Sequence, residues 1–310
     1  MNTQIAIGVD IGGSHITSAV VDIESLVIIP ETLFTVAVDN KANKEVILKK
    51  WSEAINKSIT SVSLNARANI GFAIPGPFNY KEGIALFTGE NNKFENLYQV
   101  SIPQELSKAL ISATNNFRFL NDATSFGVGV AAMGKAKNCK KIIAVTLGTG
   151  FGSAFIEDGM PLVDHPKVPK DGCLWDKKFK DGIGDDYFST RWCVSRYEAL
   201  TSIKVNGVKE IAEANTADSK AVFEEFGTNM ANFMIPFLKT YEPELIIMGG
   251  NISNAGHLFI PTLKKIITEA TGLNIGIEIS SLMEDAAIIG SAKLFNPTFW
   301  NHIKENLPNI

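Results

Sequence analysis

Residues 5–22 read IAIGVDIGGSHITSAVVD, and residues 142–158 read IIAVTLGTGFGSAFIED. Each stretch is an apolar run, a turn of small residues and a second apolar run, which predicts a strand, a glycine turn and a second strand. The ungapped register of the repeat places Val9–Ser14 over Val145–Gly150 and Asp22 over Asp158. The repeat predicts a duplicated α/β fold with two related lobes, each presenting a hairpin with a small-residue turn.

The chemistry of the two turns favours phosphate binding. Glycine permits positive φ and lets backbone N–H groups approach an anionic oxygen with no Cβ in the way. Hydroxyls at Ser14, Thr146 and Thr149 add hydrogen-bond donors. A strand follows each turn, whereas the Walker and dinucleotide motifs open a helix, so neither motif applies. A single glycine hairpin is commonly only a tight turn, but its repetition and the carboxylate at Asp10 favour a phosphate site.

Composition limits the class of protein. The chain has 310 residues, 45% of them hydrophobic and 20% charged, which suits a globular protein of one large or two medium domains. A net charge of −4 and a pI near 5.7 give no general basic surface for nucleic acid. The first ten residues lack the features of a signal or membrane segment. Cys139, Cys173 and Cys193 form neither a disulfide framework nor a zinc clip, so we expect a cytoplasmic protein with reduced thiols.

Three buried strands are predicted to end in polar or glycine-rich motifs. Asn69–Ile74 runs into Pro75-Gly76-Pro77, Asn116–Leu120 delivers Asn121-Asp122, and Pro243–Gly249 ends in Gly249-Gly250-Asn251. The helical segments are Lys44–Leu64, Gln104–Ala113, Ala123–Met133, Lys209–Ala214, Ser219–Thr240, His257–Thr271 and Asp285–Leu294. Residues 162–184 have no clear periodicity and predict an irregular excursion. We place the lobes at 1–120 and 121–284, with the C-terminal helical segment 285–302 joining the first lobe.

Asp122 is the first candidate for catalysis, because it follows a buried strand and precedes a helix. A carboxylate held there could take a proton from a hydroxyl group, although the same position suits a helix cap. Asn121 could be a ligand for a substrate or a turn residue. Asp10 could anchor Mg²⁺ through water molecules, or could simply form the turn before Gly12. Gly249-Gly250 could accommodate a nucleotide or could be an ordinary loop.

Together, these motifs resemble the ROK family of bacterial sugar kinases and sugar-responsive repressors. The resemblance rests on the order of Asp10-Ile11-Gly12-Gly13-Ser14, Pro75-Gly76-Pro77, Asn121-Asp122-Ala123, Leu147-Gly148-Thr149-Gly150-Phe151-Gly152 and Gly249-Gly250-Asn251. It implies the duplicated actin-like ATPase (ribonuclease H-like) fold, two lobes around a central cleft, and ATP-dependent phosphorylation of a hexose or N-acetylhexosamine at the primary hydroxyl. It also implies ATP with Mg²⁺, and a homodimer.

The resemblance assigns roles position by position. Asp122 is similar to the catalytic base. The residues expected to contact sugar are Asn121, Pro75, Gly76 and Asn96. The residues expected to contact nucleotide are Asp10, Gly12, Gly13, Ser14, Gly148, Thr149, Gly150, Gly249 and Gly250. Asp10 is expected to hold Mg²⁺ through water.

One segment departs from the family pattern. The Gly-Glu-x-Gly-His segment and the cysteine-rich zinc motif are replaced here by LVDHPKVPKDGCLWDKKFKDGIGDDYFS, so no structural zinc is expected. Asp164, His165 or Asp171 could replace the missing sugar contact. Because of this departure, an alternative function remains: a sensor that binds sugar or nucleotide without catalysis. Polyphosphate as the donor is a further alternative, and Gly249-Gly250 favours ATP over it. A purely ATP-hydrolysing protein would not need the Pro75–Pro77 loop. The repressor branch of the family carries an N-terminal helix-turn-helix, and because Asp10 comes early in this sequence we expect no DNA binding.

Overall fold

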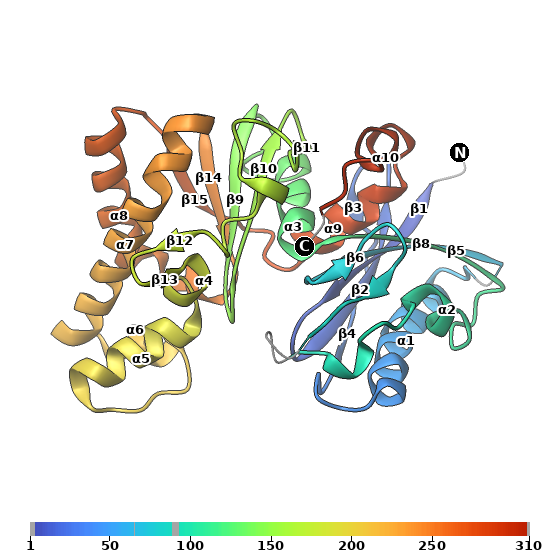
Figure 1. Cartoon of the computed structure of the whole chain (residues 1–310). Helices are drawn as coiled ribbons and strands as arrows, with labels where there is room; N and C mark the ends of the chain where they lie inside the picture. Colours follow the sequence, from blue (N-terminus) through green and yellow to red (C-terminus); the bar gives the residue numbers. More distant parts are fainter. Residues whose placement is uncertain (1–3, 65, 89–92, 309–310) are drawn as a thin grey trace. The chain divides into compact units, whose positions relative to one another are not determined.

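The chain folds as two compact units. A computed structural model describes residues 4–64, 66–88 and 93–308 (Figure 1). The first unit comprises residues 1–133 and 284–310, and the second comprises residues 134–283. Among the described residues, no helix is both long and apolar enough to cross a membrane. Each unit has its own sheet and its own core.

The sheet of the first unit has the order β3-β2-β1-β5-β8, with β4 also pairing with β2. β1 pairs antiparallel with β2 and parallel with β5, and β5 pairs parallel with β8. The strands are β1 (Ile5–Ile11), β2 (His15–Asp22), β3 (Val27–Ile28), β4 (Phe34–Ala37), β5 (Arg67–Ile74) and β8 (Thr114–Asn121), with a small ribbon of β6 (Phe78–Asn79) and β7 (Ile84–Ala85). The helices are α1 (Lys44–Ser61), η2 (Glu95–Leu97), α2 (Ile102–Ser107), α3 (Asp122–Ala132), α9 (Asp285–Ala292), η5 (Lys293–Phe295) and α10 (Pro297–Ile303).

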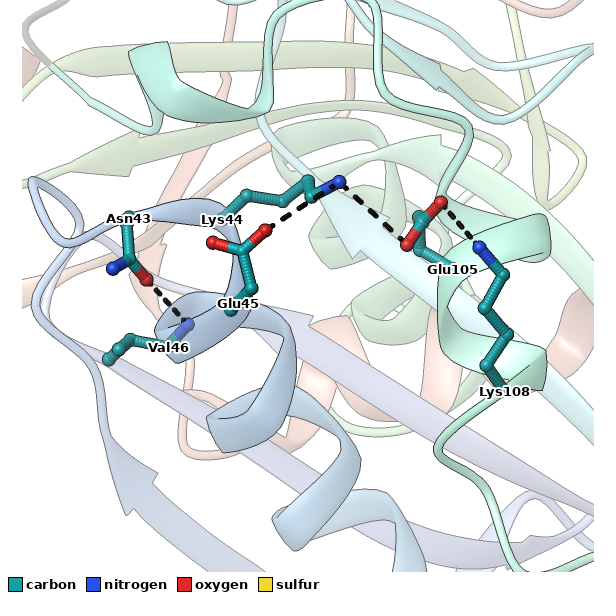
Figure 2. A network of polar contacts seen from close by, with 6 residues as sticks. All are labelled: Asn43, Lys44, Glu45, Val46, Glu105 and Lys108. Carbon is teal, nitrogen blue, oxygen red and sulfur yellow. Dashed lines mark hydrogen bonds and ion pairs between the residues drawn. The ribbon is translucent and has the colours of Figure 1, made fainter.

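Helix α1 forms as its apolar spacing predicts and ends three residues earlier than expected. Asn43 caps it by accepting a hydrogen bond from the backbone N–H of Val46 at 3.0 Å. Figure 2 shows this cap beside Lys44, whose ammonium reaches Glu105 of α2 at 3.9 Å. Trp51 is fully buried on the inner face. Helix α2 is only six residues long, much shorter than the predicted 104–113, and begins after Ser101.

The core of the first unit lies between its sheet and the helices. Its largest fully buried side chains are Trp51, Phe72, Phe78, Phe87 and Phe94. Burial of each such ring stabilises the fold by roughly 2–3 kcal/mol. Helix α9 packs on the strands and on α3, and a Cβ on Gly129 would stand 1.9 Å from the carbonyl oxygen of Ala286. Only glycine allows this approach of two helices.

This packing decides where α3 belongs. The expected boundary near residue 120 would assign α3 to the second lobe, whereas its contact with α9 groups residues up to Met133 with the first unit. Helices α9 and α10 also fold with the first unit, although they follow the whole second unit in sequence. The first unit is therefore made from both ends of the chain.

The second unit repeats the topology of the first, with the order β11-β10-β9-β14-β15. Strand β9 pairs antiparallel with β10 and parallel with β14, and β14 pairs parallel with β15, as in the first unit. The strands are β9 (Lys141–Leu147), β10 (Phe151–Glu157), β11 (Met160–Pro161), β14 (Leu245–Gly249) and β15 (Gly276–Ile279), with the ribbon β12 (Lys178–Phe179) and β13 (Gly182–Ile183). The helices are η3 (Lys170–Gly172), α4 (Gly184–Tyr187), α5 (Thr190–Thr201), α6 (Val208–Ala214), α7 (Ala217–Tyr241), η4 (Asn251–Ala255) and α8 (Gly256–Thr271).

Long helices cover the second sheet. Figure 1 shows α7 and α8, in orange, side by side next to β14 and β15. Phe223 and Phe226, three residues apart on α7, are both fully buried. Helix α5 and strand β15 were not predicted, because the first is weakly amphipathic and the second is only four residues long. The irregular nature of 162–184 is confirmed, since the segment holds only the short η3, the two-residue strands β12 and β13 and turns before α4 begins at Gly184.

The two hairpins correspond, with one correction to the register. In the first, Ile5 pairs with Asp22 and Ile11 with Ile16, so four residues form the turn. In the second, Lys141 pairs with Glu157 and Leu147 with Phe151, so three residues form the turn. Asp22 therefore corresponds to Glu157, and its predicted match with Asp158 is wrong by one residue. The ungapped register failed because it could not detect the extra residue in the first turn.

Candidate active site

Three strand ends of the first unit bring the predicted catalytic and sugar-contacting segments together. Asp10 of β1 lies opposite Ala73 of β5, and Ile74 lies opposite Asn121 of β8. Because these strands are parallel, their carboxyl ends share one edge of the sheet. Asp10, the Pro75–Pro77 loop and Asn121-Asp122 therefore lie at that edge.

Asn121, and not Asp122, is the residue that caps α3. The Asn121 Oδ1 accepts hydrogen bonds from the backbone N–H of Thr124 at 3.1 Å and from its hydroxyl at 3.3 Å. The Asn121 Nδ2 donates to the Tyr80 hydroxyl at 3.3 Å and to Asp122 at 3.0 Å. The helix begins at Asp122, one residue earlier than predicted. The sequence allowed Asp122 to be the residue that caps this helix, but Asn121 caps it instead.

Asp122 is held through one of its two carboxylate oxygens. Its Oδ1 accepts hydrogen bonds from Asn121 Nδ2 at 3.0 Å and from the backbone N–H of Ala123 at 2.8 Å. Burial raises the pKa of Asp122, although these hydrogen bonds and the charge of Lys93 act in the opposite direction. Both bonds fix the same oxygen, so Oδ2 is the atom suited to accept a proton.

Asp10 lies in an excess of negative charge. Burial, followed by the charges of Asp122 and Glu284, raises the pKa of Asp10 to about 8. The Glu284 carboxylate is 3.3 Å from His15 Nε2, and His15 Nδ1 is 3.1 Å from the Ser14 hydroxyl. Glu284 was missed by the sequence analysis, because it is distant in sequence from Asp10 and marks only the start of a helix. The cluster of carboxylates would be relieved by a cation.

The first glycine turn is lined by residues from two loops. The backbone N–H of Gly12 donates to the His15 carbonyl at 3.0 Å, which closes the turn. Asn40 Nδ2 donates to the Gly13 carbonyl. A Cβ on Gly13 would lie 3.3 Å from Cε of Lys93. Lys93 thus lies close to the turn and acts electrostatically on Asp122; its loop carries no periodic signal from which this place could have been predicted.

Of the other residues predicted to contact sugar, Pro75 and Gly76 lie beside Asn121, whereas Asn96 bonds to the turn before α1. The Pro75–Pro77 loop directly follows β5, beside Asn121, and its Gly76–Pro77 peptide bond is cis. Asn96 is exposed, and its Nδ2 donates to the carbonyls of Lys41 at 3.2 Å and Ala42 at 2.9 Å. These bonds fasten the turn before α1. The sugar-contacting roles of Pro75, Gly76, Asn96 and Asn121 stay predictions.

The second unit brings its predicted nucleotide residues together in the same way. Gly249 of β14 pairs with Thr146 of β9, next to the turn formed by Gly148, Thr149 and Gly150. Gly250 has φ +84°, and a Cβ there would lie 2.3 Å from the Leu147 carbonyl oxygen. The position therefore requires glycine both for its backbone conformation and for its close approach to the hairpin.

Asp185 and Thr190 also form hydrogen bonds with the second hairpin. Asp185 Oδ1 accepts from the backbone N–H of Phe151 at 2.7 Å, and its Oδ2 pairs with Arg191 Nη2 at 2.9 Å. The backbone N–H and hydroxyl of Thr190 donate to the Gly148 carbonyl at 2.8 and 2.9 Å. These residues could not be predicted from the sequence, because Asp185 directly follows an aperiodic segment and Thr190 begins the unpredicted α5.

The three residues that could replace the missing sugar contact, Asp164, His165 and Asp171, all belong to the second unit. His165 Nδ1 accepts from the backbone N–H of Lys167 at 3.2 Å. Asp171 belongs to η3 and has φ +59°. Asp164 is exposed. Their role in sugar binding stays a prediction.

The donor set near Asp10 suits a hydrated metal ion rather than a directly ligated one. Within residues 4–64, 66–88 and 93–308, no group of three or more His, Cys, Asp or Glu side chains is arranged to hold a metal directly. A single carboxylate in a locally negative environment nevertheless suits Mg²⁺, which usually keeps several of its water ligands. The residues therefore fit a hydrated ion held through water by Asp10.

Two sheets of the same 3-2-1-4-5 strand order, each with a glycine hairpin, define the duplicated actin-like ATPase fold. The model of the ROK family matches residues 6–164 and 182–297. The chain belongs to the ROK family. The match leaves out 165–181, within the segment whose sequence departs from the family pattern.

The relatives include several sugar kinases. The chain is 26% identical over 333 aligned positions to a glucokinase of Thermotoga maritima, covering 93% of this chain and 96% of the relative. It is 23% identical to an N-acetyl-D-glucosamine kinase of Vibrio parahaemolyticus, covering 72% and 78%. The solved ROK glucokinase of Streptomyces griseus, in complex with glucose and AMPPNP, has a TM-score of 0.71 and 21% identity, covering 94% and 99%. A xylose repressor of Caldicellulosiruptor bescii is 23% identical, covering 80% of this chain and 68% of the repressor.

Proposed function

We propose that this protein transfers the γ-phosphoryl group of ATP to the primary hydroxyl of a hexose or N-acetylhexosamine. The observation that carries the proposal is the setting of Asp122, a partly buried carboxylate anchored through Oδ1 at the start of α3. The family membership and the glucokinase and N-acetylglucosamine kinase relatives support the same reaction.

In this proposal Asp122 is the general base. Its Oδ2 takes the proton of the sugar hydroxyl as that oxygen forms a bond to the γ-phosphorus and the bond from phosphorus to the ADP oxygen breaks. Asn121 and the Ala123 N–H hold Oδ1, so the carboxylate cannot rotate freely. General-base assistance of this kind contributes about 10²–10⁴-fold to the rate.

The glycine hairpins supply the phosphate contacts. Backbone N–H groups of Gly13 and Ser14 in the first unit, and of Thr149 and Gly150 in the second, would donate to phosphate oxygens. The N–H groups of Gly12 and Gly148 close the two turns by donating to the carbonyls of His15 and Gly150. Gly249 and Gly250 would approach the adenosine. Asp10 would hold hydrated Mg²⁺ through water; when bound, this ion neutralises charge on the phosphates.

The second candidate is a sensor that binds sugar or nucleotide without catalysis. Two observations favour it: the family match omits 165–181, and a repressor is among the relatives. The homodimer stays a proposal that rests on the family resemblance. The cytoplasmic location, expected from the cysteine content, and ATP rather than polyphosphate as the donor, favoured by Gly249-Gly250, also stay proposals.

One assay separates the candidates. Release of ADP from Mg-ATP is followed against a panel of hexoses and N-acetylhexosamines, for the wild type and for Asp122→Asn. Sugar-dependent ADP release that the variant loses supports the kinase and identifies its substrate class. Stabilisation of the protein by a sugar, with no ADP release for any sugar, would support the sensor instead.

A further inference from the structure

A polar pocket lies in the first unit, away from Asp122. It has a volume of about 600 Å³ and is lined by residues of β5, β8, η5 and α10, which Figure 1 labels except for η5. Arg67 begins β5, and Asn116 lies near the start of β8. Asp122 follows Asn116 by six positions, roughly 20 Å along the extended strand. The pocket is therefore distinct from the carboxyl edge of the sheet that carries the candidate active site.

Arg118 forms one wall of this pocket with a fixed orientation. Its guanidinium lies over the rings of Phe295 and Trp300, with its Cζ 4.6 and 4.3 Å from the ring centroids. Its Nη1 donates to the Leu294 carbonyl at 2.5 Å. Stacking and this one hydrogen bond fix the plane of the group, while a guanidinium has five N–H donors in all. Arg118 thus retains donors that a planar anion or a phosphate could bind.

Arg67 brings a second positive charge to the same pocket. With the Asn116 carboxamide oriented so that its oxygen faces Arg67, that oxygen accepts from Nη2 at 2.9 Å and from Nε at 3.0 Å. Carbonyl and amide partners satisfy hydrogen bonds but leave the charges of both arginines uncompensated. In the described part of the chain neither arginine forms an ion pair, and no Asp or Glu lines the pocket.

Two guanidinium groups that have no ion-pair partner among the described residues therefore lie in one pocket of a chain whose net charge is −4. A dianionic phosphate matches two forks of donors, because each guanidinium can bind two of its oxygens. The remaining lining suits a hydroxylated organic group, with the carboxamides of Asn115 and Asn301 as hydrogen-bonding partners and Trp300 as an apolar surface.

We propose that this pocket binds a phosphate monoester of a small hydroxylated molecule, such as a sugar phosphate, through Arg67 and Arg118. The proposal does not rest on the phosphotransferase reaction, because none of these residues belongs to the candidate active site. It assigns a ligand-binding role to the amino ends of β5 and β8.

The test is isothermal titration of the full chain with glucose 6-phosphate, inorganic phosphate and glucose. Saturating AMPPNP is present, so that the phosphate-binding hairpins are occupied by nucleotide. We expect saturable binding of glucose 6-phosphate, weakened about tenfold or more in Arg67→Gln and in Arg118→Lys. Arg196→Gln is the matched control, because it removes an arginine that pairs with Glu225 at 2.7 Å in the other unit. It should change the affinity by less than about twofold.

Each other outcome is decisive. Equal affinity of the wild type and Arg67→Gln for glucose 6-phosphate would overturn the site, and so would no saturable binding. Affinity for inorganic phosphate equal to that for the ester would overturn the assignment to an ester. If Arg118→Lys fails to fold, the exposed Arg67 still carries the test.

Discussion

The side chain of Asn121 donates a hydrogen bond from Nδ2 to Oδ1 of Asp122 across 3.0 Å. The same carboxamide caps α3 through its oxygen, which accepts from the backbone N–H of Thr124. One side chain therefore fixes the start of the helix and the orientation of the carboxylate that begins it. This coupling links the stability of α3 to the chemistry assigned to Asp122.

Replacement of Asp122 by asparagine should abolish most turnover while sugar binding is kept. An amide of the same shape cannot accept the proton of the hydroxyl, so kcat, measured by coupled ADP release, should fall by about 10²–10⁴-fold. The Kd for sugar, measured by titration, should remain near the wild-type value. Asp218→Asn is the matched control, because Asp218 is an exposed aspartate in the first turn of α7. Wild-type turnover in Asp122→Asn would show that another group is the base.

Two substitutions at Asn121 should separate its two contacts. Asn121→Ser keeps a side-chain oxygen for the cap but removes the donor to Asp122, whereas Asn121→Ala removes both. We expect Asn121→Ala to lower the free energy of unfolding by about 1 kcal/mol, with a smaller loss for Asn121→Ser.

The pH dependence of kcat/KM tests the hydrogen bond from Asn121 to Asp122. Because both variants lose a donor that stabilises the charged carboxylate, the acid limb of kcat/KM should move to higher pH in both. An acid limb at the wild-type pH in Asn121→Ser would show that the 3.0 Å contact has no influence on Asp122. A rise of KM alone would instead indicate that Asn121 contacts sugar.

Stability of the ligand-free protein should fall as the pH rises. The pKa of Asp10 is about 8 in the folded protein against 3.8 for an unperturbed aspartate, so the folded protein binds the extra proton between these values. The contribution is fully present below pH 3.8 and is lost as the pH rises through about 8. The slope from this group reaches at most about 1.4 kcal/mol per pH unit. Asp122 adds to it, since its pKa is also raised.

Urea unfolding at a series of pH values between about 5 and 8.5 measures this slope. Asp10→Asn, which resembles the protonated acid, should flatten it, and the exposed Asp218→Asn should leave it unchanged. The carboxylates with lowered pKa, among them Asp22 and Glu53, affect stability only at lower pH. A slope that Asp10→Asn does not alter would contradict the raised pKa.

Alanine at Gly250 should damage the second unit more than alanine at Gly272. Both glycines have positive φ, +84° and +69°, but a Cβ would lie 2.3 Å from the Leu147 oxygen at Gly250 and within 4 Å of nothing at Gly272. Gly272→Ala should cost about 1–2 kcal/mol from conformation alone. Gly250→Ala should cost roughly 1–3 kcal/mol more. Thermal unfolding checks this order, and equal losses would show that the hairpin moves aside without cost.

Nucleotide affinity gives an independent readout for the same pair. A shift of the Leu147 backbone displaces the Gly148–Gly150 turn that follows it, so Gly250→Ala should weaken AMPPNP binding measured by titration. Gly272→Ala should bind like the wild type, because Gly272 ends α8, outside the hairpin and the Gly249-Gly250 turn.

The hairpins, the main helices and the polar strand ends could be predicted from the sequence. Apolar runs such as Ile5–Val9 and the spacing of Ile47, Trp51, Ile55 and Ile59 are local signals, because a strand or a helix repeats its inward face at a fixed interval. The order of motifs identified the family, and the family implied the duplicated fold. These features depend on residues that are neighbours in sequence.

Tertiary structure decided what lies around those motifs. The charge of Glu284 acts on Asp10, and Lys93 lies at Gly13, although no periodic signal joins these residues. The assignment of the cap to Asn121 and the extra residue of the first turn depend on backbone geometry. The raised pKa of Asp10 comes first from burial, which sums over every group packed around the carboxylate. Local pattern selects the elements, whereas desolvation and charge at a site are set by distant segments that only folding brings together.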